Sequence, residues 1–445
     1  MKGFCKILLG NKSTTFFVVA WLVFQIIYCY FCSYDELISD PGFYVYNAQE
    51  CLSRGTYFPD IFSYHSEYIF SPGYINLLII WLKIFGDIEL FCYFNVFCNA
   101  VILFLLYLIA KKLFNNIYVT NAIVLLFIAI PSNATIVLHC YTEIPFELLT
   151  LLVTFLVVFH RRRCIYYLCG ILLALAQWIR PLSIGWFIAV AIYLLYLKDY
   201  KSIVRMTIGT VLTSLCIAVF THQYFPDYLY KPVTGGVNLL MGANDKATGG
   251  YCGEARRNKD GLGYLPELFD STSYTRVRYD INSGYVYKYS NKYTYKECDS
   301  IYKARSVQWI VKNPVRWLSL IPQKLYLTYQ RAPVFAFTYN QIARDSLFIK
   351  IIGRISYAMS YLLFFVFCIS FIGLFTKFWR SKEQILIVVP IIMGTAMTVA
   401  TCGAARYAFI FIPNLLLFTS FSIINILTIL GRNDILFPDN HANNR

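Results

Sequence analysis

Long apolar stretches recur along this chain, and they constrain its fold more than any other feature. The first runs from Thr14 to Phe31, and about 20 apolar residues suffice for a helix to cross a hydrocarbon core about 30 Å thick. Within a bilayer, only helices and closed barrels satisfy every backbone N–H and C=O group. Later stretches lie near residues 90–110, 117–137, 144–159, 164–179, 182–197, 206–221, 354–376, 384–401 and 408–430. We therefore predict an all-α polytopic membrane protein with about ten transmembrane helices.

The composition agrees with a membrane protein. Only 14% of the 445 residues are charged and 58% are hydrophobic, whereas soluble domains have about 25% charged and 45–50% apolar residues. Lys and Arg number 39 against 24 Asp and Glu, which gives a net charge of +15. In a membrane protein this excess is first explained by topology, because Lys and Arg collect in short cytoplasmic loops. We therefore predict no nucleic-acid partner.

The first apolar stretch is predicted to remain in the protein as a span. It is longer than the 7–15-residue apolar core of a secretory signal, and it ends in Cys-Tyr-Phe-Cys rather than in a small-x-small cleavage site. An even number of spans puts both termini on one side of the membrane. The basic clusters all fall on that side, which we therefore predict to be cytoplasmic. They are Lys111-Lys112, Arg161-Arg162-Arg163, Lys198 with Lys201 and Arg205, and Lys377 with Arg380 and Lys382.

This topology divides the chain into three predicted parts. Residues 1–221 form an N-terminal membrane half that includes a first outer loop at 32–89, residues 222–353 form a small extracytoplasmic domain, and residues 354–445 form the last membrane helices and a short cytoplasmic tail. The segment 132–143 also faces outward, and two short outer connections carry Arg180 and Arg406.

The outer segments contain predicted helices of their own. Tyr44, Ala48, Cys51 and Leu52 have helical spacing before Gly55, which predicts an interfacial helix over 40–55. Residues 74–85 are apolar but too short to span, which predicts a re-entrant or surface-packed helix. The tyrosine-rich stretch 222–353 has two further helical runs, at 302–311 and 314–330.

Cysteine usage does not indicate a metal site. Most of the 14 cysteines lie inside apolar runs, where a free cysteine behaves as a small hydrophobic residue. Cys252 and Cys298 share a long polar segment, so a disulfide between them stays open as an alternative if that segment lies in an oxidising compartment.

Asp40 is the first candidate for chemistry, because it lies at the predicted outer face within Asp40-Pro41-Gly42-Phe43-Tyr44. An Asp directly before Pro is also a good helix N-cap, with Pro at the first helical position. Composition does not choose between a base and a cap. Ser71-Pro72-Gly73-Tyr74 follows before the short apolar helix.

The order of these motifs resembles the first outer loop of bacterial GT-C membrane glycosyltransferases related to protein O-mannosyltransferases and to lipid A aminoarabinose transferase. Other segments resemble the same superfamily, although at Arg406 the expected first proline is missing because Phe409 and Ile410 occupy that region. These segments are Tyr141-Thr142-Glu143, Gly170 to Arg180-Pro181, the stretch 236–250, the run 309–314, and Arg406-Tyr407 with Pro413. The resemblance covers about nine tenths of the chain.

The resemblance implies an enzyme that transfers a sugar, with inversion, from an undecaprenyl- or dolichyl-phosphate donor. The implied acceptor is a lipid, glycan or protein at the periplasmic or extracellular side of the plasma membrane. Asp40 would accept the acceptor's proton, Glu143 would help to place the donor, and Arg180 or Arg406 would bind the donor phosphate. Three tyrosines would position substrates, namely Tyr44, Tyr74 and Tyr407.

Alternatives to these roles remain open on the sequence alone. Glu143 could reach toward the membrane surface, and the two arginines could contact lipid head groups. A divalent cation is not required by the sequence, and no ligand spacing predicts a metal site among Asp35, Glu36, His65 and Glu67. An O-antigen or capsule polymerase or ligase is a second candidate function. A lipid or solute transporter is a third, and it should place ionisable groups near mid-membrane.

Overall fold

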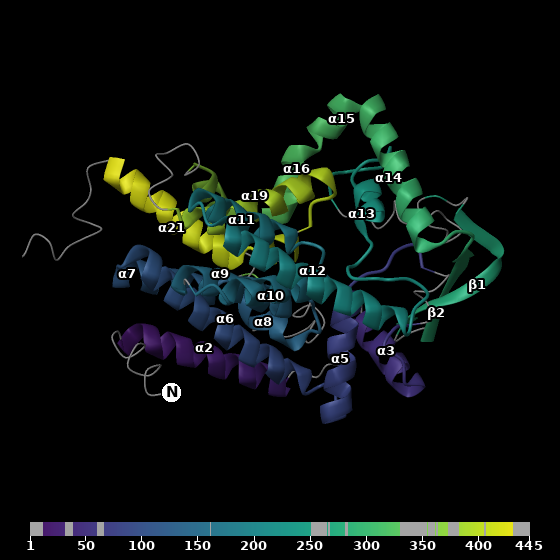
Figure 1. Ribbon diagram of the computed structural model, residues 1–445, viewed down its shortest axis with the longest axis horizontal. Helices are drawn as coiled ribbons and strands as arrows, with labels where there is room; N and C mark the ends of the chain where they lie inside the picture. The colour runs from purple at the N-terminus through teal and green to yellow at the C-terminus, as the bar shows by residue number, and fades with distance from the viewer. Residues whose placement is uncertain are drawn as a thin grey trace, which may run out of the picture.

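A computed structural model shows a chain built mainly of helices, many of which run side by side along one axis (Figure 1). The structure describes residues 12–31, 39–59, 66–160, 162–250, 265, 268–280, 284–329, 354, 361, 364–372, 382–404 and 406–429. The fold prediction is confirmed, because the chain is a helical polytopic membrane protein, to which the structure adds one β-hairpin.

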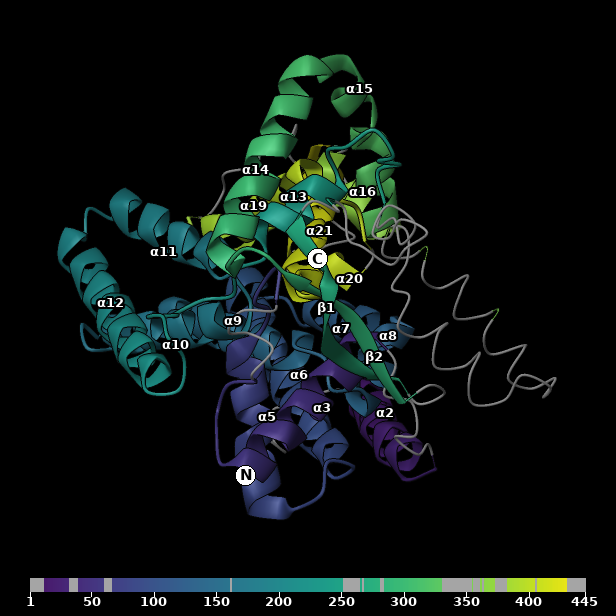
Figure 2. The same cartoon turned by 90° about the vertical axis from the view of Figure 1, so that its right-hand side faces the viewer.

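Three described helices are long and apolar enough to cross a bilayer by themselves. They are α2 (Lys12–Phe31), α6 (Phe91–Phe114) and α12 (Tyr200–His222), and the apolar part of α2 matches the predicted first span. Only 17% of the apolar window of α12 is buried, so this helix presents a wide apolar face outward, as a lipid-facing helix does. Figure 2 shows α11 and α12 on one side of the molecule.

The predicted span 117–137 is bent rather than continuous. Helix α7 (Ile117–Ala129) is followed by α8 (Pro131–Thr135) and the 3-10 helix η1 (Ile136–Leu138), and the two parts meet at 66°. Pro131 starts the second part, because proline lacks an N–H and its ring clashes with the preceding turn. Asn133 stabilises the bend by donating from Nδ2 to the Phe127 carbonyl at 2.8 Å.

Several predicted spans form shorter helices. These are α9 (Glu143–Phe159), α10 (Ile165–Ile179), α11 (Ile184–Tyr196), α19 (Gln384–Ala400) and α21 (Ile412–Ile429). The predicted span 354–376 lies largely outside the described residues, although 364–372 is helical.

Both predicted helices of the loop 32–89 are present. Helix α3 (Ser39–Arg54) ends before Gly55, whose φ of +69° suits glycine. Tyr44, Ala48 and Cys51 face the core, as their spacing predicts. Helix α5 (Pro72–Phe85) also packs into the core, with Ile75, Leu78 and Ile79 fully buried among its residues.

The tyrosine-rich segment 222–353 contains four described helices and the β-hairpin. Helices α13 (Gly235–Met241), α14 (Tyr295–Lys312), α15 (Pro314–Ser319) and α16 (Ile321–Tyr329) precede the undescribed residues that begin at 330. The single helix predicted over 314–330 breaks at Leu320, just before the turn that contains Pro322. Helices α14, α15 and α16 form an arch that projects from the bundle (Figure 1).

The hairpin pairs β1 (Phe269–Asp280) with β2 (Gly284–Asn291) in antiparallel register, with Thr275 opposite Lys288. It is followed by α14, which begins with a capping box between Thr294 and Glu297. The possible disulfide involves Cys252, which lies outside the described residues, so it stays an open alternative.

Candidate functional site

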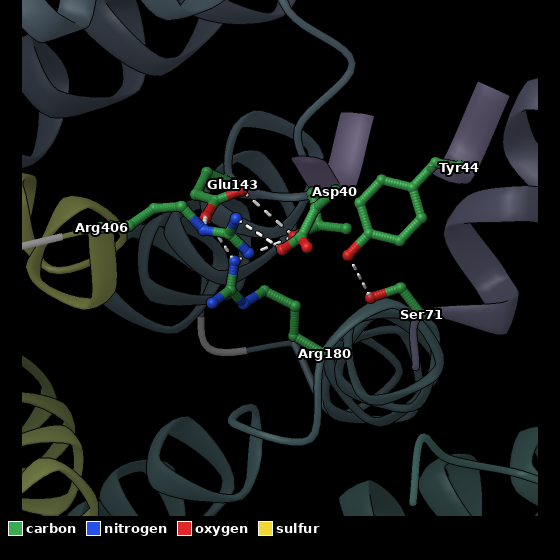
Figure 3. A network of polar contacts seen from close by, with 7 residues as sticks. Asp40, Tyr44, Ser71, Glu143, Arg180 and Arg406 are labelled. Carbon is green, nitrogen blue, oxygen red and sulfur yellow. Dashed lines mark hydrogen bonds and ion pairs between the residues drawn. The ribbon is translucent and has the colours of Figure 1, made fainter. Parts of the chain in front are cut away.

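Four charged side chains from distant parts of the sequence meet in one network of ion pairs (Figure 3). Asp40 lies in the first turn of α3, Glu143 is the first residue of α9, Arg180 follows the last residue of α10, and Arg406 begins the short helix α20 (Arg406–Phe409). We call these four residues the charged cluster. Sequence analysis selected all four, and the structure brings them together.

Arg406 connects the two carboxylates of the cluster. Its Nη1 lies 2.6 Å from Asp40 Oδ2, and its Nε lies 2.7 Å from Glu143 Oε1. Arg180 approaches the same Glu143 oxygen, with Nη1 at 2.7 Å. Two positive and two negative groups therefore balance one another in a chain that runs from Asp40 to Arg180.

Thr142 completes this network, and sequence analysis did not assign it a role. Its hydroxyl accepts a hydrogen bond from Arg180 Nη1 at 2.9 Å and donates to Glu143 Oε2 at 3.1 Å. The only sequence signal was its position directly before Glu143. Thr142 fixes the arginine and the carboxylate relative to each other, as groups that support a charged site commonly do.

Burial differs strongly across the charged cluster. The Glu143 side chain is 0% exposed and that of Arg180 is 8% exposed, whereas the Arg406 and Asp40 side chains are 21% and 39% exposed. A buried carboxylate is costly unless it is paired. Glu143 therefore acts as the fixed centre of the cluster, and Asp40 is the carboxylate that solvent or a substrate can reach.

These contacts contradict two of the alternative roles. Glu143 and Arg180 are too buried, and too closely paired with each other, to reach toward lipid head groups. The N-cap role of Asp40 is also not what the structure shows, because α3 begins at Ser39 and Asp40 lies inside its first turn, bonded to Arg406. A carboxylate in a first turn still interacts favourably with the helix dipole.

Of the predicted substrate-positioning tyrosines, Tyr44 and Tyr407 lie near the charged cluster, and Tyr74 packs against Tyr44. Tyr44 and Tyr74 are almost fully buried and their rings meet edge to face at 5.1 Å, while the Tyr44 hydroxyl lies 3.2 Å from Ser71 Oγ. Burial, together with the charge of Asp40, raises the pKa of Tyr44. Tyr407 is half-buried, and burial raises its pKa as well.

Tyr141 is a further aromatic group at the charged cluster. The Arg406 guanidinium lies over its ring, 5.0 Å from the centroid, at a distance typical of a cation–π contact. Burial raises the pKa of Tyr141 to about 12, although the Arg406 charge opposes the shift. Tyr141 therefore remains a neutral phenol at ordinary pH and helps to orient Arg406.

Glu147 is a buried carboxyl group that sequence analysis did not single out. It lies one turn after Glu143 on α9, is 2% exposed, and its Oε2 has no hydrogen-bond partner among the described residues. The spacing of four residues puts the two glutamates on one face of α9. Glu147 thus differs from Glu143 in that no described basic residue pairs with it.

Among the described residues, no group of three or more His, Cys, Asp and Glu side chains is placed to hold a metal ion. Asp35, Glu36 and His65 lie outside the described residues. Glu67 is 6% exposed and accepts a hydrogen bond from the Tyr302 hydroxyl of α14, so it belongs to a second network.

The charged cluster has two chemical capacities. Asp40 is an ionised or protonatable carboxyl group that remains partly exposed, so it can accept a proton. A guanidinium carries five N–H donors in a planar fork, more than the ion pairs of Arg406 use, so this partly exposed arginine can also bind phosphate oxygens.

The chain was compared with known families, curated proteins and solved structures. No family model matches it, and no curated protein matches it. Two crystal structures of ArnT from Cupriavidus metallidurans are similar to it in part. The apo structure has a TM-score of 0.38 and 12% identity, over 94% of this chain and 78% of that one. The structure bound to undecaprenyl phosphate has a TM-score of 0.37 and 13% identity, over 93% and 78%. At this degree of superposition and identity, the likeness does not by itself assign the chain to a family.

Proposed function

We propose that the protein is a membrane glycosyltransferase that moves one sugar from a polyprenyl-phosphate donor to an acceptor at the outer face of the plasma membrane. The observation that carries the proposal is the charged cluster, in which two arginines share a buried glutamate and one of them also pairs with a partly exposed carboxylate. This combination supplies a base and a phosphate-binding group within one site.

In the proposed reaction, Asp40 accepts the proton of an acceptor hydroxyl while the oxygen of that hydroxyl attacks the anomeric carbon of the donor sugar. The new carbon–oxygen bond forms as the bond between the anomeric carbon and the phosphate oxygen breaks, and the electron pair leaves with the polyprenyl phosphate. A single displacement of this kind inverts the anomeric centre. The phosphate gains one negative charge as it departs, and guanidinium groups stabilise charge that develops in a transition state.

Each member of the charged cluster has its own part in this proposal. Glu143 is fully buried between both arginines and keeps their forks in place. Arg406 is held by Asp40 at rest, and it turns toward the donor phosphate when that group competes with Asp40 for its N–H donors. Protonation of Asp40 during transfer neutralises the carboxylate that is paired with Arg406. The positive charge of Arg406 then attracts the leaving phosphate more strongly.

The proposed location follows from the charge distribution along the sequence. The basic clusters at 111–112, 161–163 and 198–205 mark the cytoplasmic side, which leaves the ends of α9 and α10 that carry Glu143 and Arg180 outside. The charged cluster lies at helix ends rather than within broken helices at mid-membrane, where a transporter would place its ionisable groups. This favours transfer at the membrane surface over transport.

The experiment is transfer by the purified protein. Radiolabelled polyprenyl-phosphate sugars are incubated with the protein and with membrane extracts that contain lipid, glycan and protein acceptors. We expect label to move from the donor to one acceptor fraction, and Asp40→Asn to slow the transfer about 10²–10⁴-fold, as loss of a general base does. Absence of transfer from every donor, or a normal rate in Asp40→Asn, would contradict the proposal.

A further inference from the structure

A fully buried lysine lies in α16, in the arch formed by α14, α15 and α16. Lys324 is 0% exposed, and its Nζ donates to two backbone carbonyls, those of Val399 at 2.9 Å and Gly242 at 3.3 Å. Among the described residues, no carboxylate lies within ion-pair distance of this nitrogen. Lysine is almost never fully buried without a charged partner, so the position of Lys324 requires a reason.

The two carbonyls belong to the ends of two different helices. Val399 lies in the last turn of α19, where carbonyl groups lack partners within the helix and carry the negative end of its dipole. Gly242 follows the last residue of α13. Lys324 therefore joins α16, α13 and α19 through one cation, and Figure 1 shows the end of α16 beside α19. Burial lowers the pKa of Lys324 to about 8, because desolvation disfavours the charged amine.

Two glycines show how tightly this junction is packed. A Cβ atom on Gly403 would lie 2.3 Å from the Lys324 carbonyl oxygen, and one on Gly242 would lie 1.7 Å from the Thr401 carbonyl oxygen. The Gly403 amide also donates to the Gly249 carbonyl at 2.8 Å. The segment 401–404 is thus held between α16 on one side and the loop after α13 on the other.

This segment leads directly to Arg406 of the charged cluster. We propose that Lys324 is a positioning residue, which fixes the end of α19 and the segment 401–404 and thereby sets the guanidinium of Arg406 between Asp40 and Glu143. A loss of the two hydrogen bonds made by Lys324 loosens the attachment of the end of α19 to the tyrosine-rich segment. The backbone at Arg406 is then held less firmly in place, although none of the residues that Arg406 contacts has been replaced.

Cys402 provides a test that does not depend on the proposed function. It is 0% exposed, belongs to the segment 401–404, and lies near enough to Lys324 to interact with it electrostatically. The full-length protein in detergent is treated with N-ethylmaleimide, and labelling of Cys402 is followed by mass spectrometry of its peptide. We expect Cys402 to be protected in the wild type and to be labelled at least about tenfold faster in Lys324→Met, as expected for local opening of a buried segment.

Lys312→Met is the matched control, because Lys312 is an exposed lysine at the end of α14. It should leave Cys402 protected. Lys324→Gln is the second variant if the Met variant does not fold: its uncharged amide is one atom shorter than the lysine side chain and cannot reach both carbonyls, so it should also expose Cys402 to labelling. Protection of Cys402 in folded Lys324→Met or in folded Lys324→Gln would overturn the proposal.

A double-mutant comparison tests the link to Arg406, and this part rests on the proposed function. If Lys324 acts through Arg406, Lys324→Met should slow transfer about tenfold or more in the wild type but less than about twofold in an Arg406→Lys background, because coupled residues are not additive. Equal losses in both backgrounds would show that Lys324 acts independently, which overturns the proposal. If the wild type transfers no sugar, the proposed function fails, and the labelling of Cys402 still decides whether Lys324 holds this segment.

Discussion

Replacement of Glu143 by glutamine should destabilise the protein far more than the same replacement of Glu147, one turn away on α9. Both side chains are buried, at 0% and 2% exposure. Glu143 is paired with Arg180 and Arg406 at 2.7 Å each. Glutamine keeps the shape and polarity of the side chain, and it removes only the negative charge.

The cost follows from what is left behind. Arg406 would still be paired with Asp40, but Arg180, whose side chain is 8% exposed, would keep its hydrogen bond to the neutral Thr142 hydroxyl and lose its carboxylate partner. Breaking a buried ion pair by removing one partner costs about 3–5 kcal/mol, because it leaves an uncompensated charge. That is a large share of a total stability of about 5–15 kcal/mol.

Glu147→Gln is the matched control. Since no described basic residue pairs with Glu147, its replacement should cost less than about 1 kcal/mol. The free energy of unfolding of both variants is measured in the same detergent, from the cooperative loss of helical circular dichroism in denaturant. Equal stability of Glu143→Gln and wild type would refute the view that Glu143 is the fixed centre of the charged cluster.

Four further predictions follow from the site and its surroundings. Asp40→Ala and Asp40→Asn should lose transfer activity alike. Each should lose no more than about 1 kcal/mol of stability, because the ion pair with Arg406 is partly exposed. A stable Asn variant that still transfers sugar would contradict this. Arg406→Lys should raise the donor KM while leaving the fold intact, because lysine lacks the planar fork, and wild-type kinetics would return Arg406 to a structural role. Burial lowers the pKa of His139 to about 4, below an unfolded value of about 6.5, so the unfolded chain binds more protons than the folded protein between these pH values. Stability should therefore fall by at most about 3 kcal/mol as the pH drops from about 6.5 to about 4. His139→Gln should remove this pH dependence of the melting temperature. Cysteine placed at position 260 should react with an impermeant maleimide from outside, whereas labelling of position 162 from that side would refute the topology.

Much of the fold could be predicted because each helix depends mainly on its own residues. The apolar stretch Thr14–Phe31 and the spacing of Tyr44, Ala48 and Cys51 are local signals, and the structure confirms both helices. The bend at Pro131 was also a local signal, but its apolar surroundings favoured a single span. The β-hairpin was missed because its polar, tyrosine-rich strands lie within a segment that also contains helical runs.

The candidate site was only partly predictable. Asp40 and Arg406 were each selected from local motifs, but their ion pair joins positions 366 residues apart. No local pattern specifies such a pairing. Glu147 and Lys324 were missed for a related reason, since burial of a polar side chain depends on the neighbours that the fold brings to it.

The shortness of α10 and α11 also determines the depth of the charged cluster in the membrane. Their 15 and 13 residues rise by about 1.5 Å each, which gives lengths of about 22 and 20 Å, well below a hydrocarbon thickness of about 30 Å. Such hydrophobic mismatch is accommodated by local thinning of the bilayer or by flanking side chains that reach outward. Arg180 lies in the connection between these two helices. We therefore expect the lipid leaflet to be thinner around the charged cluster than elsewhere, so that the depth of Arg180 below the lipid phosphates depends on the thickness of the surrounding bilayer.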